Sequence, residues 1–196
     1  MILPHIHTPG IALEATRTRT GREVHAEFAD RGVRSIDRRD VLSSPTIWPN
    51  RRMQEISAQF FVRVGEERAL LGYVSLHEFN PNSGYVKCAV TVDREAPEDV
   101  HTAVVALTVN YAFAMWSIRK LYFWTPEPEV RGLAATGAVP AREGTLPEHL
   151  LDEGTLRPVN VFALYRAQWE ETGVAFVESL VAGAGTREYL VDRGTS

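Results

Sequence analysis

The chain has 196 residues, a length that suits one domain or one domain with a tail and that can bury a substantial core. Hydrophobic residues make up 44% of it and charged residues 23%, as in ordinary soluble globular proteins. The 25 acidic residues outnumber the 21 lysines and arginines, and the net charge of −4 excludes a global positive field that would recruit nucleic acid or an anionic membrane.

Four segments of the first half are predicted strands, because each alternates in polarity or is rich in β-branched residues. They are residues 11–18, 56–64, 69–79 and 85–92. Turns are expected at 65–68 and 80–84, where the sequence offers Gly, Asn and Pro. Residues 23–41 favour short helical stretches, and residues 43–50 favour a loop.

Residues 98–118 are predicted to form the helix around which the rest of the chain is organised. Pro97 has the fixed φ that suits a first helical position, and Glu98 and Asp99 place negative charge beside the free N–H groups of the first turn. Two apolar stripes at helical spacing cover opposite sides, so the helix should be largely buried. The first stripe is Val100, Val104, Leu107, Tyr111, Ala114 and Ile118, and the second is Val105, Val109, Ala112, Phe113 and Trp116.

After the helix, the sequence predicts an aromatic strand at 120–125, which Pro126 stops. Residues 129–136 favour a short helix, residues 139–158 are loop-rich, and residues 159–166 form the final predicted strand. The expected fold class is therefore α/β, with a mixed sheet in one layer and helices on its faces.

A strand, a buried helix and a second strand make a crossover unit, in which the helix begins at the C-terminal end of the first strand. Such a helix N-terminus is a ready site for an anionic ligand, so function should be sought near residues 93–103. We expect one domain over residues 1–170 and a tail, 171–196, that holds one short helix.

The expected compartment follows from cysteine use and from the N-terminus. The single cysteine, Cys88, cannot form an internal disulfide, which suits a reducing compartment. The first residues lack the basic segment and apolar run of a signal peptide, and no apolar run approaches the roughly 20 residues of a membrane span. We therefore expect a cytoplasmic protein without a membrane segment.

Five short phrases stand in a particular order along the chain: Leu71 to Leu76, Leu107 to Phe113, Lys120 to Trp124, Ala141 to Leu146 and Ala163 to Trp169. Together they resemble the GNAT acyltransferase superfamily, and most closely the branch that acetylates the N-termini of ribosomal proteins. The resemblance implies one GNAT-like domain, in which two splayed parallel strands surround a buried helix. It also implies an N-acyltransferase that uses acetyl-CoA or another acyl thioester and acts on a small-molecule or peptide amine.

In that superfamily the acyl-donor arm enters between the splayed strands, and a loop of pattern Gln/Arg-x-x-Gly-x-Gly/Ala opens the central helix and holds the pyrophosphate. The six positions here run from Glu98 to Ala103, and only Ala103 fits the pattern. Glu98 replaces a basic residue and His101 replaces a glycine, so the donor site should be atypical. By position, the resemblance assigns Val92, Val100, Thr102 and Ala103 to the donor. Elsewhere Lys87 replaces a carboxylate that is common on the family's fourth strand. Pro126 replaces the Asn that usually follows the fifth strand, Glu129 replaces a Ser three residues later, and Ala138 replaces a Phe after the glycine that closes the next helix.

Three side chains are candidates for acid–base work. His101 lies in the first turns of the helix, where the dipole lowers an imidazole pKa and favours a neutral base. Glu78 lies with His77 at the end of the third predicted strand, where either can border a substrate cleft, and Tyr85 on the fourth strand can donate a proton. Ordinary structural roles remain open for all three. His5 and His7 have no third ligand in the sequence, so no metal site is predicted.

Two functional hypotheses stay open. The first is a GNAT-fold N-acyltransferase that moves an acyl group from a thioester to an amine and has an atypical donor site. The second is a catalytically silent or repurposed GNAT-like domain that does not use acetyl-CoA and binds another ligand or runs a different reaction. Nucleic acid and membranes are not expected partners, and both a monomer and a homodimer are compatible with the sequence.

Overall fold

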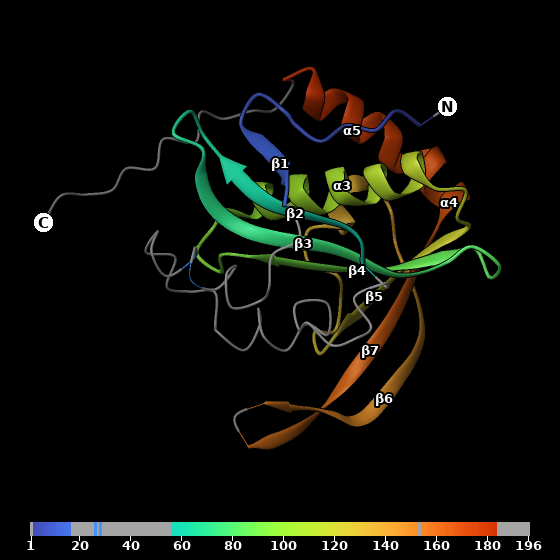
Figure 1. Cartoon of the computed structure of the whole chain (residues 1–196). Coiled ribbons are helices and arrows are strands. Elements are labelled where there is room, and N and C mark those ends of the chain that lie inside the picture. Colours follow the sequence, from blue (N-terminus) through green and yellow to red (C-terminus); the bar gives the residue numbers. More distant parts are fainter. Residues whose placement is uncertain (1, 17–25, 27, 29–55, 153, 184–196) are drawn as a thin grey trace, which may run out of the picture.

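The computed structural model describes residues 2–16, 26, 28, 56–152 and 154–183 (Figure 1). Seven of its strands form one mixed sheet in the order β1-β2-β3-β4-β5-β7-β6. Their bounds are β1 Ile11–Ala15, β2 Ile56–Val64, β3 Ala69–Asn80, β4 Tyr85–Val92, β5 Lys120–Thr125, β6 Ala141–Asp152 and β7 Thr155–Tyr165. Only β4 and β5 run parallel, and every other neighbouring pair is antiparallel. The predicted α/β class, with a mixed sheet, is confirmed.

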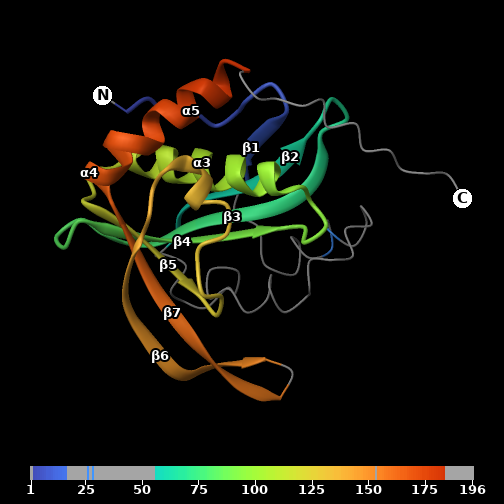
Figure 2. The ribbon, with the colours of Figure 1, turned by 180° about the vertical axis from the view of Figure 1, so that it is seen from behind.

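Helix α3, Glu98–Met115, is the predicted central helix and ends three residues earlier than expected, because Trp116 is already extended. It lies along one face of the sheet, and both of its apolar stripes are largely buried. Helix α5, Val174–Val181, packs on α3 on the side away from the sheet (Figures 1 and 2). Between β7 and α5 lie α4, Arg166–Gln168, and one π-helical turn, Trp169–Gly173.

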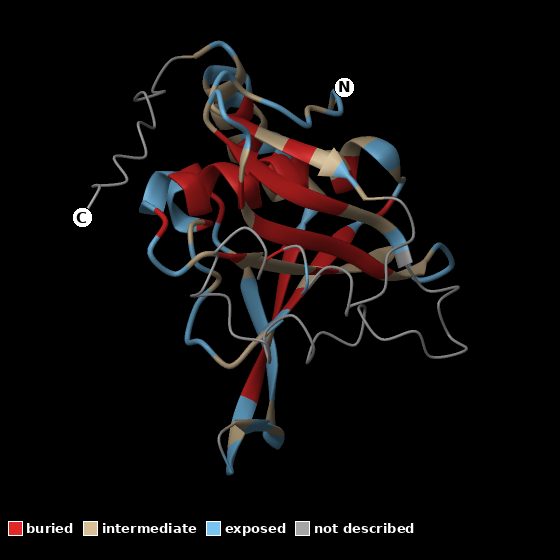
Figure 3. Cartoon of the chain, turned by 60° about the vertical axis from the view of Figure 1, so that its left-hand side comes forward, coloured by how far each residue is buried: buried red, intermediate tan, exposed pale blue. Residues whose placement is uncertain are grey.

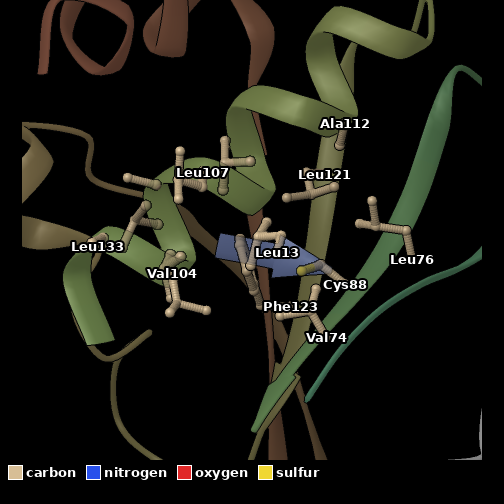
Figure 4. Packing of buried hydrophobic residues seen from close by; sticks show 14 of the residues in the cluster. Leu13, Val74, Leu76, Cys88, Val104, Leu107, Ala112, Leu121, Phe123 and Leu133 are labelled. Carbon is tan, nitrogen blue, oxygen red and sulfur yellow. The ribbon is translucent and has the colours of Figure 1, made fainter. Parts of the chain in front are cut away.

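The core lies between α3 and the sheet. Figure 3 shows buried residues concentrated in α3 and the central strands, whereas most of β6 is exposed. Close packing joins side chains of α3, such as Val104 and Leu107, with strand residues such as Val74, Cys88 and Leu121 (Figure 4). Cys88 is therefore a buried core residue, and burial raises the pKa of its thiol far above the usual range.

The opposite face of the sheet is here called the outer face. Phe61 on β2 and Tyr73 on β3 point to it, and Phe28 packs edge-on against Phe61 with ring centroids 6.2 Å apart. The predicted short helices of 23–41, apart from residues 26 and 28, and the predicted loop of 43–50 lie outside the described residues. No helix in the described ranges is long and apolar enough to cross a membrane.

Two expectations for the second half are wrong. Residues 139–158 are not loop-rich, because β6 and β7 form a long hairpin that extends from the body of the molecule (Figures 1 and 2). The segment 129–136 is not a full helix and contains only one 3₁₀ turn, η2, at Ala134–Thr136. Gly132 has a φ of 77°, which interrupts helical geometry before that turn. The residues of β6 alternate poorly because both faces of the hairpin are largely exposed.

Candidate functional site

The parallel strands β4 and β5 separate part of the way along. Their pairing runs from Tyr85 with Lys120 to Cys88 with Phe123 and goes no further, although β4 continues to Val92. We call the gap between β4 and β5 beyond Cys88 and Phe123 the wedge. The N–H of Asp93 donates to the carbonyl of Leu71 on β3 at 2.8 Å, and backbone groups alternate in direction along an antiparallel strand. The backbone groups of Val90 and Val92 therefore point toward the wedge, where β5 offers them no partner.

Next to the wedge, the outer face carries a pocket of about 290 Å³. Its lining residues come from three neighbouring strands and are Tyr85, Lys87, Tyr122, Trp124 and Val161. Register explains why they meet: Lys87 is directly opposite Tyr122, and Trp124 is opposite Val161, so these side chains share one face. Residues between them, such as Val86 and Leu121, face α3 and the core. The pocket thus has mostly aromatic walls and one cationic side chain.

Lys87 is held in this pocket by two neighbours. Its Nζ lies 2.6 Å from Oε2 of Glu78 and 3.9 Å from the centroid of the Trp124 ring. Glu78 reaches it from an irregularity in the β3–β4 pairing, where its φ is 49°. A non-glycine residue in this region costs about 1–3 kcal/mol, and such strain is often found at functional sites. His149 of β6 packs edge-to-face with Trp124, and the two ring centroids are 5.8 Å apart.

A second polar cluster centres on Glu143 of β6. Both of its oxygens accept from Nζ of Lys120 at 3.0 Å. The hydroxyl of Tyr165 donates to it at 2.6 Å and that of Tyr122 at 2.8 Å. The hydrogen bond from Tyr165, with further ones from Tyr122 and Lys120, lowers the pKa of Glu143 to about 2. The cluster connects β5, β6 and β7 beside the pocket, and it fixes the position of Tyr122 in the pocket wall.

Glu143→Gln is expected to destabilise the protein at neutral pH and to cost progressively less as the pH falls. The pKa of this carboxyl is about 2 in the folded chain against a reference of 4.5, so its contribution is complete above 4.5 and disappears as the pH falls through 2. Urea unfolding of both proteins at neutral pH and at about pH 3 measures the difference. An equal loss at both pH values would show that the charge of Glu143 does not stabilise the fold.

A segment after β5 packs against α3 at His101 and Thr102, whereas Pro97, Glu98 and Asp99 at the start of the helix are exposed. Arg131 Nε lies 2.9 Å from Glu98 Oε2, in an exposed ion pair. At Gly132, a Cβ would lie 2.8 Å from the backbone nitrogen of Thr102, so the two backbones are in direct contact. Beneath this segment, the imidazole Nε2 of His101 is buried and has no partner among the described residues. Burial lowers the pKa of His101, and the nearby charge of Arg131 lowers it further.

The sequence-predicted residues fall into two groups. Glu78 and Tyr85 come together around Lys87 on the outer face, while His101 lies on the α3 side of the sheet and belongs to a separate place. Of the donor residues, Val92 borders the wedge, whereas Val100, Thr102 and Ala103 are buried in α3. Their assigned roles remain predictions.

Sequence reasoning did not identify Trp124, Tyr122 or Glu143, and it noted Lys87 only as a missing carboxylate. Strict alternation along 85–87 and 122–124, read together with parallel pairing, would have placed Tyr85, Lys87, Tyr122 and Trp124 on one face. Within the described residues, no group of three or more His, Cys, Asp or Glu is arranged to hold a metal ion.

Several solved structures that are similar to this chain are GNAT acetyltransferases. A GCN5-related N-acetyltransferase from Brucella melitensis has a TM-score of 0.65 at 17% identity, over 93% of this chain and 89% of that chain. A probable GNAT-family acetyltransferase from Chromobacterium violaceum has a TM-score of 0.57 at 17% identity, over 84% of this chain and 87% of that one.

The spermidine N-acetyltransferase of Vibrio cholerae, solved in complex with CoA and spermine, has a TM-score of 0.56 at 17% identity, over 82% of this chain and 98% of that one. No protein-family profile and no curated protein sequence matches the chain. At such low identity these likenesses establish the fold, and they leave the chemistry to be argued from the residues of this chain.

Proposed function

We propose that this chain, which has the fold of the GNAT acetyltransferases, transfers an acyl group from a thioester to an amine. The observation that carries the proposal is the wedge, where β4 and β5 part after Cys88 and Phe123. An extended thioester arm in the wedge would hydrogen-bond to the backbone of Val90 and Val92, as a neighbouring strand would. Its acyl carbon would then lie beside the pocket, which an amine would enter from the outer face.

The residues at the start of α3 do not fit the pyrophosphate of CoA. The backbone contact between Gly132 and Thr102 restricts the approach of a phosphate along that side of the first turns of α3. Glu98 and Asp99 add negative charge, which Arg131 offsets in part. A phosphate charge about 4 Å from an unpaired carboxylate costs about 4 kcal/mol at an effective dielectric of about 20, and less where it is exposed. We therefore assign donor recognition to the wedge and not to phosphate contacts.

Two side chains at the pocket supply the proton transfers that the reaction requires. Amine attack on a thioester needs a proton acceptor, and departure of the thiolate needs a proton donor. Glu78 is the acceptor, because Lys87 holds its carboxylate at the pocket. Tyr85 forms part of the pocket wall and donates the proton. His101 is not assigned to either proton transfer, because its imidazole is buried beside the segment that packs against α3.

The test is a product assay with two donors, acetyl-CoA and the phosphate-free thioester S-acetyl-N-acetylcysteamine, against a panel of polyamines, amino-acid amides and short peptides. Mass spectrometry should detect an acetylated amine, and Glu78→Gln should lower its rate by about tenfold or more. Asp152→Asn is the matched control, because that carboxylate pairs with Arg157 at the far end of the hairpin. If no amine is acetylated from either donor, the proposal fails.

The second candidate is a domain that does not use acetyl-CoA, and the acidic start of α3, together with the segment packed against His101 and Thr102, favours it. In either case we expect acetyl-CoA to bind with a dissociation constant no tighter than about 100 μM, which corresponds to about −5.5 kcal/mol. Titration calorimetry measures it, with S-acetyl-N-acetylcysteamine as the comparison that lacks phosphate. Binding of acetyl-CoA in the low micromolar range would mean that the segment containing Arg131 and Gly132 moves away from α3.

A further inference from the structure

The chain contains only two lysines, Lys87 and Lys120, against 19 arginines among the 21 basic residues. Both lie on the outer face at the β4–β5 pair, where Tyr85 is opposite Lys120 and Lys87 is opposite Tyr122. Every side-chain amine of the protein is therefore at the candidate site. Arginine stays protonated at physiological pH, so its guanidinium is a poor nucleophile toward thioesters. Lys87 is the nearer of the two to the wedge, since the pairing of β4 with β5 begins at Lys120 and ends one residue after Lys87.

The two lysines are held differently. Lys120 begins β5, binds both oxygens of Glu143 at 3.0 Å, and does not line the pocket. Lys87 lines the pocket and pairs with a single oxygen of Glu78. It also precedes Cys88, the last paired residue of β4, and its Nζ lies over Trp124, the first residue of β5 beyond the pairing. The amine of Lys87 is thus at the mouth of the wedge.

We propose that Lys87 is itself an acyl acceptor, so that the chain acylates its own Nζ from a thioester bound in the wedge. This inference rests on the proposed function, because it uses the same donor. The ammonium of Lys87 gives one proton to the carboxylate of Glu78, which lies 2.6 Å away. The free amine attacks the thioester carbonyl, the C–N bond forms and the C–S bond breaks. The thiolate leaves as a thiol, taking one proton, and a second proton is released to solvent.

Acylation would change the pocket as well as the residue. The resulting amide is neutral, so the ion pair with Glu78 and the cation–π contact with Trp124 are both lost. The carboxylate of Glu78 and the ring of Trp124, which lines the pocket, are then left without their internal cation. Such a surface suits the ammonium group of a second amine.

The experiment incubates the full chain with S-acetyl-N-acetylcysteamine and follows acetylation by peptide mapping, which needs no variant. Lys87 should be acetylated about tenfold or more faster than Lys120, and faster than either lysine in the urea-unfolded chain. Equal rates at the two lysines, or equal rates in the folded and unfolded chain, would indicate ordinary chemical acetylation and overturn the inference.

Two variants test whether Glu78 is the cause of the faster acetylation of Lys87. Glu78→Gln removes the proton acceptor and should slow acetylation of Lys87 by about tenfold. Asp152→Asn should leave it unchanged, and circular dichroism confirms that both variants are folded. If Glu78→Gln is folded and acetylates Lys87 at the rate of the parent protein, the assigned role of Glu78 as proton acceptor is wrong.

The free-amine assay separates this inference from the proposed function. Acetylated free amine together with an unmodified Lys87 would overturn the inference and leave the function standing. Acetyl-Lys87 without any free-amine product would support the inference and overturn the proposed transfer to a free amine. When neither product forms, both proposals fail together.

Discussion

Leu107→Ala is expected to lower the free energy of unfolding by about 2–5 kcal/mol. Leu107 is at the middle of α3 and packs among the core side chains (Figure 4), and its exposed fraction is 0%. Removing its side chain would leave a cavity that the packed neighbours can fill only in part. Denaturant unfolding of the two proteins measures the loss.

Met115→Ala is the matched control for this substitution. Met115 is in the same helix, but 48% of it is exposed, so its replacement should change the stability by no more than about 0.5 kcal/mol. A loss of less than about 0.5 kcal/mol for Leu107→Ala as well would mean that this side of α3 does not carry the core.

Periodicity made the centre of the fold predictable. Helix α3 is buried along most of its length, and β4 and β5 on either side of it bury residues against it, so apolar residues recur at helical or strand spacing. The hairpin of β6 and β7 shows the opposite case. Leu151 and Leu156 near the end of the hairpin are more than half exposed. Strand β6 has no apolar face that would distinguish its sequence from that of a loop. Strand pairing there depends on the partner strand, which periodicity within one segment does not reveal.

The candidate site was predictable only in part, because it depends on register. Alternation alone places Tyr85 and Lys87 on one face, but the contact with Tyr122 and Trp124 requires knowing that β4 and β5 pair in parallel. The approach of Glu78 to Lys87 follows from a local irregularity in the β3–β4 ladder. Bulges of this kind redirect a side chain without leaving a pattern in the sequence.

At the start of α3, the residue types were readable from the sequence, but the contact with a distant segment was not. The replacement of a glycine by His101 and of a basic residue by Glu98 predicts weakened phosphate binding. That prediction did not indicate that the segment containing Gly132 packs against the first turns of the helix. The contact between Gly132 and Thr102 depends on the path of the chain after β5, where a glycine with φ of 77° allows the backbones to touch.

Arg166→Met should cost about 3 kcal/mol or more, because one guanidinium satisfies three carbonyl groups at the end of α3. Arg166 donates to Phe113 O at 2.7 Å, to Trp116 O at 2.6 Å and to Ile118 O at 2.7 Å. The last carbonyl groups of a helix have no partners within it, and each one left buried without a hydrogen bond costs about 1–3 kcal/mol. Because Ile118 leads into β5, the same contacts fix β5, and hence the wedge, relative to α3.

Thermal and urea unfolding measure this loss, and Arg157→Met is the control. Arg157 forms an exposed ion pair with Asp152, and such pairs contribute about 0–1 kcal/mol. Arg166→Lys should recover only part of the stability, since an ammonium on one stem cannot match the fork that reaches all three carbonyls. A loss of under about 1 kcal/mol in Arg166→Met would show that water replaces the guanidinium, and that β5 is held against α3 by apolar packing alone.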